Sequence, residues 1–214
     1  MAKLTKSTPS PTTARSTKTS RRSDANRNRR NLNYLVIGTG VIFALLIGLV
    51  IYLNIRRSIP VDGQETLTAQ GNLHVPAGSP SAFAYNSTPP TSGPHYDGMV
   101  EWGVSPQPQQ YEYLLHNLED GGVVIYYQCP AGCEEIVTAL EAIVQPYLST
   151  QRKLVMVPND RSWLDPNGQP LHKDMGAKIA VTAWGKLLKL DEVDATRIQA
   201  FIAQNEGIDH HSGV

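Results

Sequence analysis

The sequence predicts an α/β fold that is attached to a membrane by one N-terminal helix. A run of twenty residues without a charged side chain, Tyr34 to Leu53, lies near the N-terminus. Farther along, short β-branched and aromatic runs alternate with segments whose apolar residues recur at three- and four-residue spacing, as in helices packed on a sheet. We therefore expect four parts, in this order: a disordered basic cytoplasmic tail (1–33), a transmembrane helix (34–54), a linker (55–72) and an extracytoplasmic domain (73–214).

The apolar run has the length and composition of a membrane-spanning helix. About twenty helical residues cross the roughly 30 Å of hydrocarbon in a bilayer, and glycines such as Gly38 and Gly48 are common in spanning helices. A cleaved signal peptide has a shorter apolar core, of about 7 to 15 residues, and ends in a small-residue cleavage site. Here Arg56 and Arg57 follow the run closely. We therefore predict a membrane anchor rather than a signal peptide.

Basic residues on the two sides of the run predict its orientation. Residues 1–33 hold nine Lys and Arg side chains and one acid, Asp24, whereas no Lys or Arg occurs between Arg57 and Arg152. Because the basic excess stays in the cytoplasm, we expect the N-terminus inside the cell and the C-terminal domain outside. The tail is rich in Ser, Thr, Asn and Arg and has almost no apolar residues, so we expect it to be disordered.

The outer domain is acidic. From Ser58 onward there are eight Lys and Arg side chains and eighteen Asp and Glu, so its net charge is 8 − 18 = −10. Binding to nucleic acid requires basic side chains that neutralise phosphates, and we therefore expect no nucleic-acid partner. A cation, or another membrane protein with a basic surface, fits this charge better.

The first half of the domain, His74 to Gln110, is dense in proline, glycine and serine. Proline disfavours the interiors of strands and helices alike, so we expect an ordered loop with at most short strands. After it, Tyr111 to Leu118 is predicted as a strand, and Glu119-Asp120-Gly121-Gly122 as a turn. Val123 to Tyr127 is a β-branched and aromatic run of the length of a buried strand.

The second half predicts two helices and three further strands. Glu134 to Leu148 has an apolar stripe at helical spacing and two leading glutamates, which suit the positive end of a helix dipole. Asp191 is the expected N-cap of the last helix. The strands are expected at Lys153–Val157, Lys178–Trp184 and Lys186–Leu190. From Val123 the order is the β-α-β-β-β-α of a reduced thioredoxin-like core, with a long loop before its last two strands and a loop-rich N-terminal extension.

Four stretches together resemble the bacterial, typically membrane-anchored family called domain of unknown function 3105. They are HVPAG at 74–78, YNSTPPTSGPHY at 85–96, HNLEDGGVVIYY at 116–127 and TAWGKLLKLD at 182–191. The resemblance covers essentially the whole outer domain and implies architecture, since the family brings no established activity. The family usually reads His-x-Leu-Glu-His-Gly where this chain has Asp120 in place of the second histidine. If that position binds a metal in relatives, a carboxylate shifts the preference toward harder ions.

The only two cysteines, Cys129 and Cys133, lie between a predicted strand and a predicted helix. Three interpretations stay open: a structural disulfide, which an outer compartment permits; a copper(I) site made of two soft thiolates; and a redox-active pair, whose thiols a helix start would acidify. The spacing also resembles, over about ten residues, the membrane-tethered Sco-type copper chaperones. That resemblance implies a distal histidine as a further ligand, for which His172 is the candidate.

Histidines form the second set of candidates. His74, His95 and His116 all lie in or near the loop-rich half, and with Asp120 they have the donor types of a copper or zinc site. The alternative is that each imidazole hydrogen-bonds to the backbone and orders an under-packed segment. The pair His210-His211 is expected to lie in a solvated terminal tail.

The sequence leaves three functional hypotheses. The first is a cell-surface module that binds a metal, preferably copper, or handles thiols. The second is a non-catalytic accessory or scaffold protein that docks to another membrane component, with aromatic residues of the loop-rich half as its contact surface (Tyr85, Tyr96, Trp102, Tyr111 and Tyr113). The third is a thiol-disulfide oxidoreductase. No phosphate-binding loop, nucleophile elbow or His-Glu-x-x-His motif is present.

Overall fold

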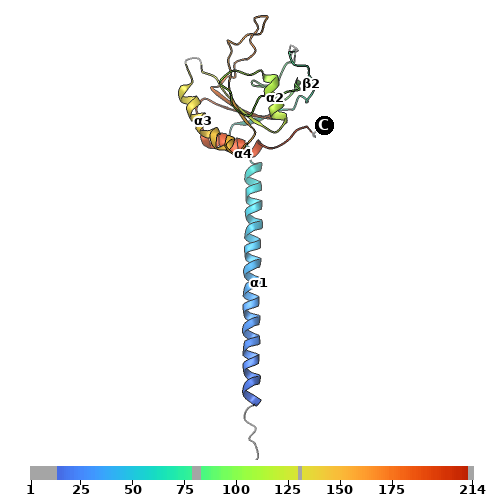
Figure 1. The fold of residues 1–214 in the computed structure, drawn as a ribbon, viewed down its shortest axis with the longest axis vertical. Coiled ribbons are helices and arrows are strands. Elements are labelled where there is room, and N and C mark those ends of the chain that lie inside the picture. The colour runs from blue at the N-terminus through green and yellow to red at the C-terminus, as the bar shows by residue number, and fades with distance from the viewer. Residues whose placement is uncertain (1–13, 79–82, 130–131, 212–214) are drawn as a thin grey trace, which may run out of the picture. The chain divides into compact units, whose positions relative to one another are not determined.

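The computed structural model describes residues 14–78, 83–129 and 132–211. The chain divides into two compact units, Met1–Arg56 and Arg57–Val214. The first contains all but the last two residues of the long helix α1, and the second contains an α/β domain (Figure 1).

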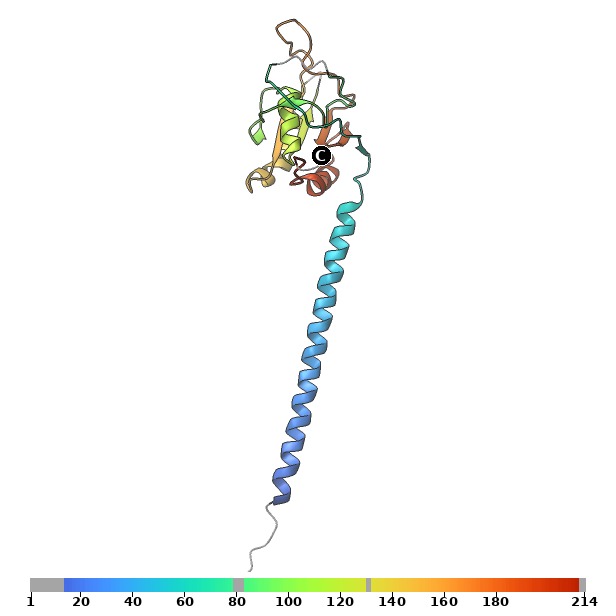
Figure 2. The same ribbon diagram turned by 90° about the vertical axis from the view of Figure 1, so that its right-hand side faces the viewer.

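Helix α1 runs from Ala14 to Ser58 without interruption (Figure 1 and Figure 2). Its segment Asn33–Ile55 is long and apolar enough to cross a membrane, as an anchor or as a signal sequence. The helix starts about twenty residues before the predicted boundary, so residues 14–33, expected to be disordered, are helical here. Once a helix is nucleated, each further residue adds one hydrogen bond, and no proline lies between Ala14 and Ser58 to stop it. Pro60 lies just beyond its end.

The second unit is built on a six-stranded mixed sheet in the order β1-β8-β7-β5-β6-β4. Strand β6 pairs parallel with β4 on one side and with β5 on the other, whereas β5, β7, β8 and β1 pair antiparallel in turn. The strand bounds are Gln64–Thr66 (β1), Gly103–Val104 (β4), Val123–Tyr127 (β5), Leu154–Pro158 (β6), Ile179–Ala183 (β7) and Lys186–Leu190 (β8). A separate two-stranded sheet pairs β2 (His74–Val75) with β3 (His95–Tyr96).

Helices cover both faces of the large sheet. Strand β5 shows why: Val123 and Ile125 face one apolar cluster, and Val124 and Tyr126 face another. The first cluster also contains residues of α3 (Glu134–Leu148) and α4 (Ala195–Asn205), and the second contains residues of α2 (Tyr111–Glu119). A strand buried on both faces is apolar throughout rather than alternating, which is the pattern of β5. The sheet is therefore the middle of three layers.

The predicted strand at Tyr111 to Leu118 was wrong, because this segment is helix α2. Its apolar residues Tyr111, Leu114, Leu115 and Leu118 lie at positions i, i+3, i+4 and i+7 and are all buried. That spacing places them on one face of a helix but on both faces of a strand. The helical period, rather than the β-propensity of the two tyrosines, decides the local structure.

Two further expectations differ from the structure. The N-cap of α4 is Asp194, whose side chain accepts a hydrogen bond from the Arg197 N–H at 3.0 Å, and not Asp191. Residues 55–72, expected as a linker, contribute β1 to the sheet and Val61 to the core. Strand β1 is a three-residue, mostly exposed edge strand, which is too short and too polar to leave an alternating pattern in the sequence.

Tyr96 and Tyr111 are buried, and Tyr85 and Trp102 pack partly against the second apolar cluster. Four of the five aromatic residues that the scaffold hypothesis assigned to a contact surface therefore help to fill the interior of the domain. The prediction that a partner docks there has no support from their placement.

Candidate metal centre

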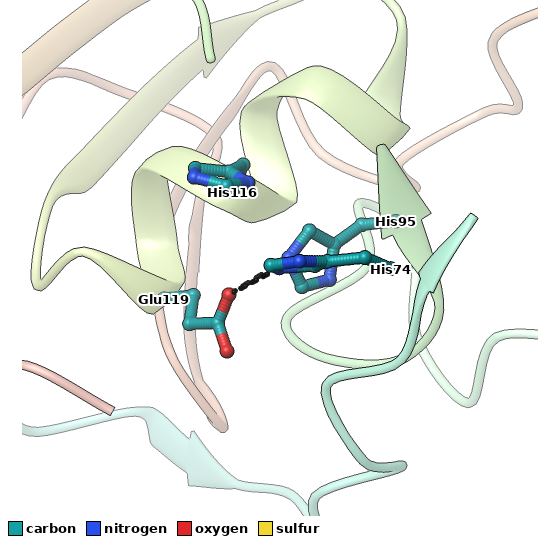
Figure 3. Close-up of side chains that lie close together, drawn as sticks. All are labelled: His74, His95, His116 and Glu119. Carbon is teal, nitrogen blue, oxygen red and sulfur yellow. Dashed lines mark hydrogen bonds and ion pairs between the residues drawn. The ribbon is translucent and has the colours of Figure 1, made fainter. Parts of the chain in front are cut away.

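The short β2–β3 sheet brings two histidines together. Its strands are parallel, and their register pairs His74 directly with His95 (Figure 3). The chain approaches His95 through Gly93, whose φ of +122° is one that a side chain rarely adopts. The Gly93 N–H donates to the Gly71 carbonyl, and the His95 N–H donates to the Leu73 carbonyl. Two segments about twenty residues apart thus present their imidazoles side by side, with ring centroids 4.7 Å apart.

Helix α2 supplies the other two residues of the cluster. His116 and Glu119 are three residues apart, so they share one face of the helix (Figure 3). Gly121 and Gly122 end the helix: their N–H groups donate to the carbonyls of Leu118 and Asn117 in a Schellman arrangement. Because the helix ends directly after Glu119, these hydrogen bonds fix the backbone from which its carboxylate extends.

The four side chains converge on one region. Glu119 Oε2 lies 3.0 Å from His74 Nε2 and 2.9 Å from His95 Nε2. The His116 ring is stacked on that of His74, with centroids 5.1 Å apart, and lies 5.4 Å from that of His95. One donor atom from each of the four residues falls within 4.8 Å of the others. A single ion can therefore contact all four after small movements of the side chains.

Backbone carbonyls hold two of the imidazoles by their Nδ1 atoms. His95 Nδ1 lies 2.9 Å from the Gly93 carbonyl oxygen, and His116 Nδ1 lies 3.0 Å from that of Tyr96. A carbonyl oxygen can only accept, so both Nδ1 atoms carry the proton. In the neutral rings Nε2 then has a free lone pair. Outer hydrogen bonds of this kind are usual for histidines that bind metals.

Burial sets the charge states of the two least exposed members. The His95 side chain is 0% exposed and that of Glu119 is 1% exposed. Burial lowers the pKa of His95, which favours the neutral imidazole. Burial acts to raise the pKa of Glu119, but hydrogen bonds from His74 and Asn72 outweigh it, so the pKa of this carboxyl falls below its usual value. At pH 7 the pair is a neutral imidazole and a carboxylate, the forms that bind metals.

The structure brings together three of the four residues that the sequence suggested. His74, His95 and His116 form the cluster, but its carboxylate is Glu119. Asp120 lies in a neighbouring group with His116 and His211. Reading residues 111–118 as a strand hid Glu119, because only a helix places it on the same face as His116. Nothing in the sequence around His211 pointed to the site.

The cysteine pair and His172 do not form a comparable site. Cys129 and Cys133 are joined by a disulfide, with α-carbons 5.4 Å apart, so neither sulfur is a thiolate. His172 is buried, and both of its ring nitrogens are used. Its Nδ1 accepts from the Asp160 N–H at 2.9 Å, and its Nε2 donates to the Gln109 carbonyl at 2.8 Å. Of the three interpretations of the pair, the observed state is the disulfide.

Comparison with known proteins gives one match. The model of a family described as "Protein of unknown function (DUF3105)" matches residues 77–212. This range includes His95, His116, Glu119 and His211 and begins three residues after His74. Neither the curated proteins nor the solved structures contain a match to the chain.

Proposed function

The chain belongs to the family of proteins of unknown function DUF3105, and from the centre that it carries we propose that it binds one copper ion outside the cell membrane. The ligands are His74, His95, His116 and Glu119. Zn²⁺ suits the same donors, but Cu²⁺ binds more tightly to a given set of nitrogen and oxygen ligands. The sequence suggested copper at the cysteines and copper or zinc at the histidines, and the proposal assigns copper to the histidines.

The contact between His95 and Glu119 carries this proposal. With its proton on Nδ1, neutral His95 directs a lone pair at a carboxylate oxygen only 2.9 Å away. Two lone pairs at that distance repel each other, and the repulsion is strong because both side chains are buried. A proton on Nε2 would relieve the repulsion, but it would make a charged imidazolium that burial disfavours. A bound cation relieves it without this penalty.

The two closest donor pairs of the metal-free cluster have a spacing that a tetragonal copper site also requires. The two measured donor pairs are 2.9 and 3.0 Å apart. Two donors each about 2.0 to 2.1 Å from an ion and about 3 Å from each other subtend an angle of roughly 90°. Tetragonal Cu²⁺ with nitrogen and oxygen ligands has such angles, whereas a tetrahedral zinc site requires wider ones.

Copper titration of the full-length protein in detergent tests the proposal. After chelation, the protein should take up one equivalent of Cu²⁺, and its electron paramagnetic resonance spectrum should show coupling to imidazole nitrogens. The double variant Cys129→Ser/Cys133→Ser is the matched control and should give the same stoichiometry and spectrum. Uptake that this variant loses would assign copper to the sulfurs. No uptake by either protein would end the proposal.

The sheet also supports the thioredoxin-like core expected from the sequence, which we propose as the framework of the domain. The central strands lie in the order β6-β5-β7-β8, with β5 parallel to β6 and antiparallel to β7. Residues of α3 and α4 pack in the same apolar cluster. The metal centre involves α2 and the β2–β3 sheet, and both lie outside that core. Redox chemistry by the cysteines before α3 is not part of the proposal.

Membrane anchoring with the domain outside completes the proposed function. It is supported by the apolar segment Asn33–Ile55, by the nine basic residues before it, and by the disulfide, which persists in oxidising compartments. Protease added to intact cells should digest the domain and leave the N-terminal tail intact. An epitope tag at each end would report the two fragments. Digestion of the tail in intact cells, with the domain protected, would reverse the orientation.

A further inference from the structure

We infer that the C-terminal segment provides an outer metal-binding set, His116, Asp120 and His211, through which an ion reaches the inner set of His74, His95, His116 and Glu119. Within the described residues, these are the two groups whose donor atoms all lie within 4.8 Å of one another. The inference rests on the proposed function, because it states how the same centre is loaded.

Backbone pairing holds the C-terminal segment beside the end of α2. The Gly207 N–H donates to the Gly121 carbonyl at 2.8 Å, and the His210 N–H donates to the Glu119 carbonyl at 2.9 Å. The His210 ring also stacks on Trp184, with centroids 5.9 Å apart and an angle of 24° between the planes. Residues 207–210 are therefore anchored to the helix end that carries Glu119, and His211 follows directly.

The side chain of His211 is oriented like those of the inner histidines. Its Nδ1 lies 2.9 Å from Asp209 Oδ1, and its Nε2 lies 3.4 Å from Glu119 Oε2. The Asp209 carboxylate accepts the proton of Nδ1, so in the neutral ring the lone pair of Nε2 is directed at the inner set. A carboxylate behind an imidazole is a usual outer partner of a histidine that binds a metal.

Two ions cannot occupy both sets at once. His116 belongs to both sets, and its Nδ1 is engaged with the Tyr96 carbonyl. Only Nε2 can bind a metal, and one lone pair serves one ion. The two sets are therefore alternative positions of a single ion, which moves between them by exchanging its other ligands while His116 stays bound.

Exposure gives the direction of transfer. In the outer set, the Asp120 side chain is 22% exposed and that of His211 is 41% exposed. In the inner set, Glu119 and His95 are at most 1% exposed. A hydrated ion that arrives from the side of His211 meets the outer set first, and Asp120 supplies negative charge that attracts it.

A second route by which an ion can reach the inner set passes His74. Asp97, which lies near His74, provides the matched control for this route. His74 is 36% exposed, and Asp97, 83% exposed, lies 3.7 Å from His74 Nδ1. Replacing Asp97 with Asn removes the same charge as replacing Asp120, but from beside His74 instead of from beside His211. If negative charge alone accelerates loading, the two substitutions should act equally.

Stopped-flow mixing of the chelated full-length protein with Cu²⁺ separates these possibilities. His211→Ala and Asp120→Asn should each slow uptake on the order of tenfold, the lower end of what a focusing charge contributes to an association rate. Because uptake and release use the same route, both variants should release copper to a chelator more slowly by the same factor. Asp97→Asn should leave the rate of uptake unchanged.

Each other outcome has a distinct meaning. Two equivalents of copper per wild-type chain would show two separate sites and overturn the inference. Unchanged rates in His211→Ala, or equal slowing by Asp97→Asn, would also overturn it while leaving the proposed inner site intact. Faster release with normal uptake would make His211 a ligand of the final site instead. If the wild-type protein binds no copper, the proposed function itself fails, and the loading route fails with it.

Discussion

Replacing Glu119 with glutamine should abolish stable copper binding and leave the domain folded. Glutamine keeps the size of the side chain, but its neutral amide offers the ion no negative charge and still shares one cavity with two imidazoles. The loss in affinity should exceed the roughly 10- to 100-fold that removal of an outer-shell partner costs. Copper at about 100 times its dissociation constant adds about 2.7 kcal/mol to stability, which raises Tm by roughly 5 to 10 °C in a domain of this size. The variant should show no such rise.

Glu206→Gln is the matched control for the loss of a mostly buried carboxylate. Glu206 is paired with Arg152 and accepts a hydrogen bond from the Lys153 N–H, and its side chain is 7% exposed. Burial acts to raise the pKa of Glu206, but the hydrogen bonds from Arg152 and Lys153 outweigh it and lower the pKa. Its contribution to stability is therefore present above the usual pKa of 4.5 and is lost as the pH falls through the lowered value. This variant should be less stable at pH 7 and still bind copper.

A copper-dependent rise in Tm in Glu119→Gln equal to that of the wild type would contradict the assignment of Glu119 as a ligand. Loss of the copper-dependent rise in Tm in both variants would show that removing any buried carboxylate prevents copper binding by destabilising the domain. Differential scanning calorimetry of the full-length proteins, with and without copper, distinguishes these outcomes, because metal-free and metal-bound transitions are compared within each variant.

The elements that the sequence predicted well are those with many apolar residues at a regular spacing. The bounds of β5, α3 and β8 agree with the predicted ones, and those of β6 and β7 differ by one residue at each end. Strands β2, β3 and β4 have only two residues each, and such short pairs leave no alternation to detect. Their pairing depends on the chain path through the proline-rich half, which local patterns do not determine.

The candidate site was predictable only in part, because only some of its residues stand out in the sequence. The three histidines are chemically conspicuous and lie in segments that had to be ordered without a large core of their own, so their convergence was a reasonable hypothesis. Glu119 was missed because residues 111–118 were predicted as a strand and Glu119 as the start of a turn, whereas it is the last residue of helix α2. His211 is 92 residues from Glu119 in the sequence, and only the backbone pairing of residues 207–210 with the end of α2 brings it to the centre.

Because residues 207–210 are paired with the end of α2, we expect the second large effect, a loss of stability, from Gly121→Ala. Gly121 has a φ of +82°, and a Cβ there would lie 2.7 Å from the Ile208 carbonyl oxygen and 2.9 Å from its nitrogen. A left-handed backbone costs alanine about 1 to 2 kcal/mol, and forcing an atom into a packed site costs typically 1 to 3 kcal/mol more. Ile208 cannot move away without straining the hydrogen bonds of Gly207 and His210 to α2. We therefore expect a loss of roughly 2 to 5 kcal/mol.

Gly168→Ala separates the two contributions, because Gly168 has nearly the same φ, +79°, and no atom within 4 Å of the added Cβ. It should cost only the backbone part, about 1 to 2 kcal/mol. Urea unfolding of both variants measures the difference, which is the energy of the collision with Ile208. In Gly121→Ala the displaced segment should also slow copper uptake as His211→Ala does, whereas Gly168→Ala should load normally. Equal losses of stability in the two variants would mean that the C-terminal segment yields freely, and that it does not hold His211 at the centre.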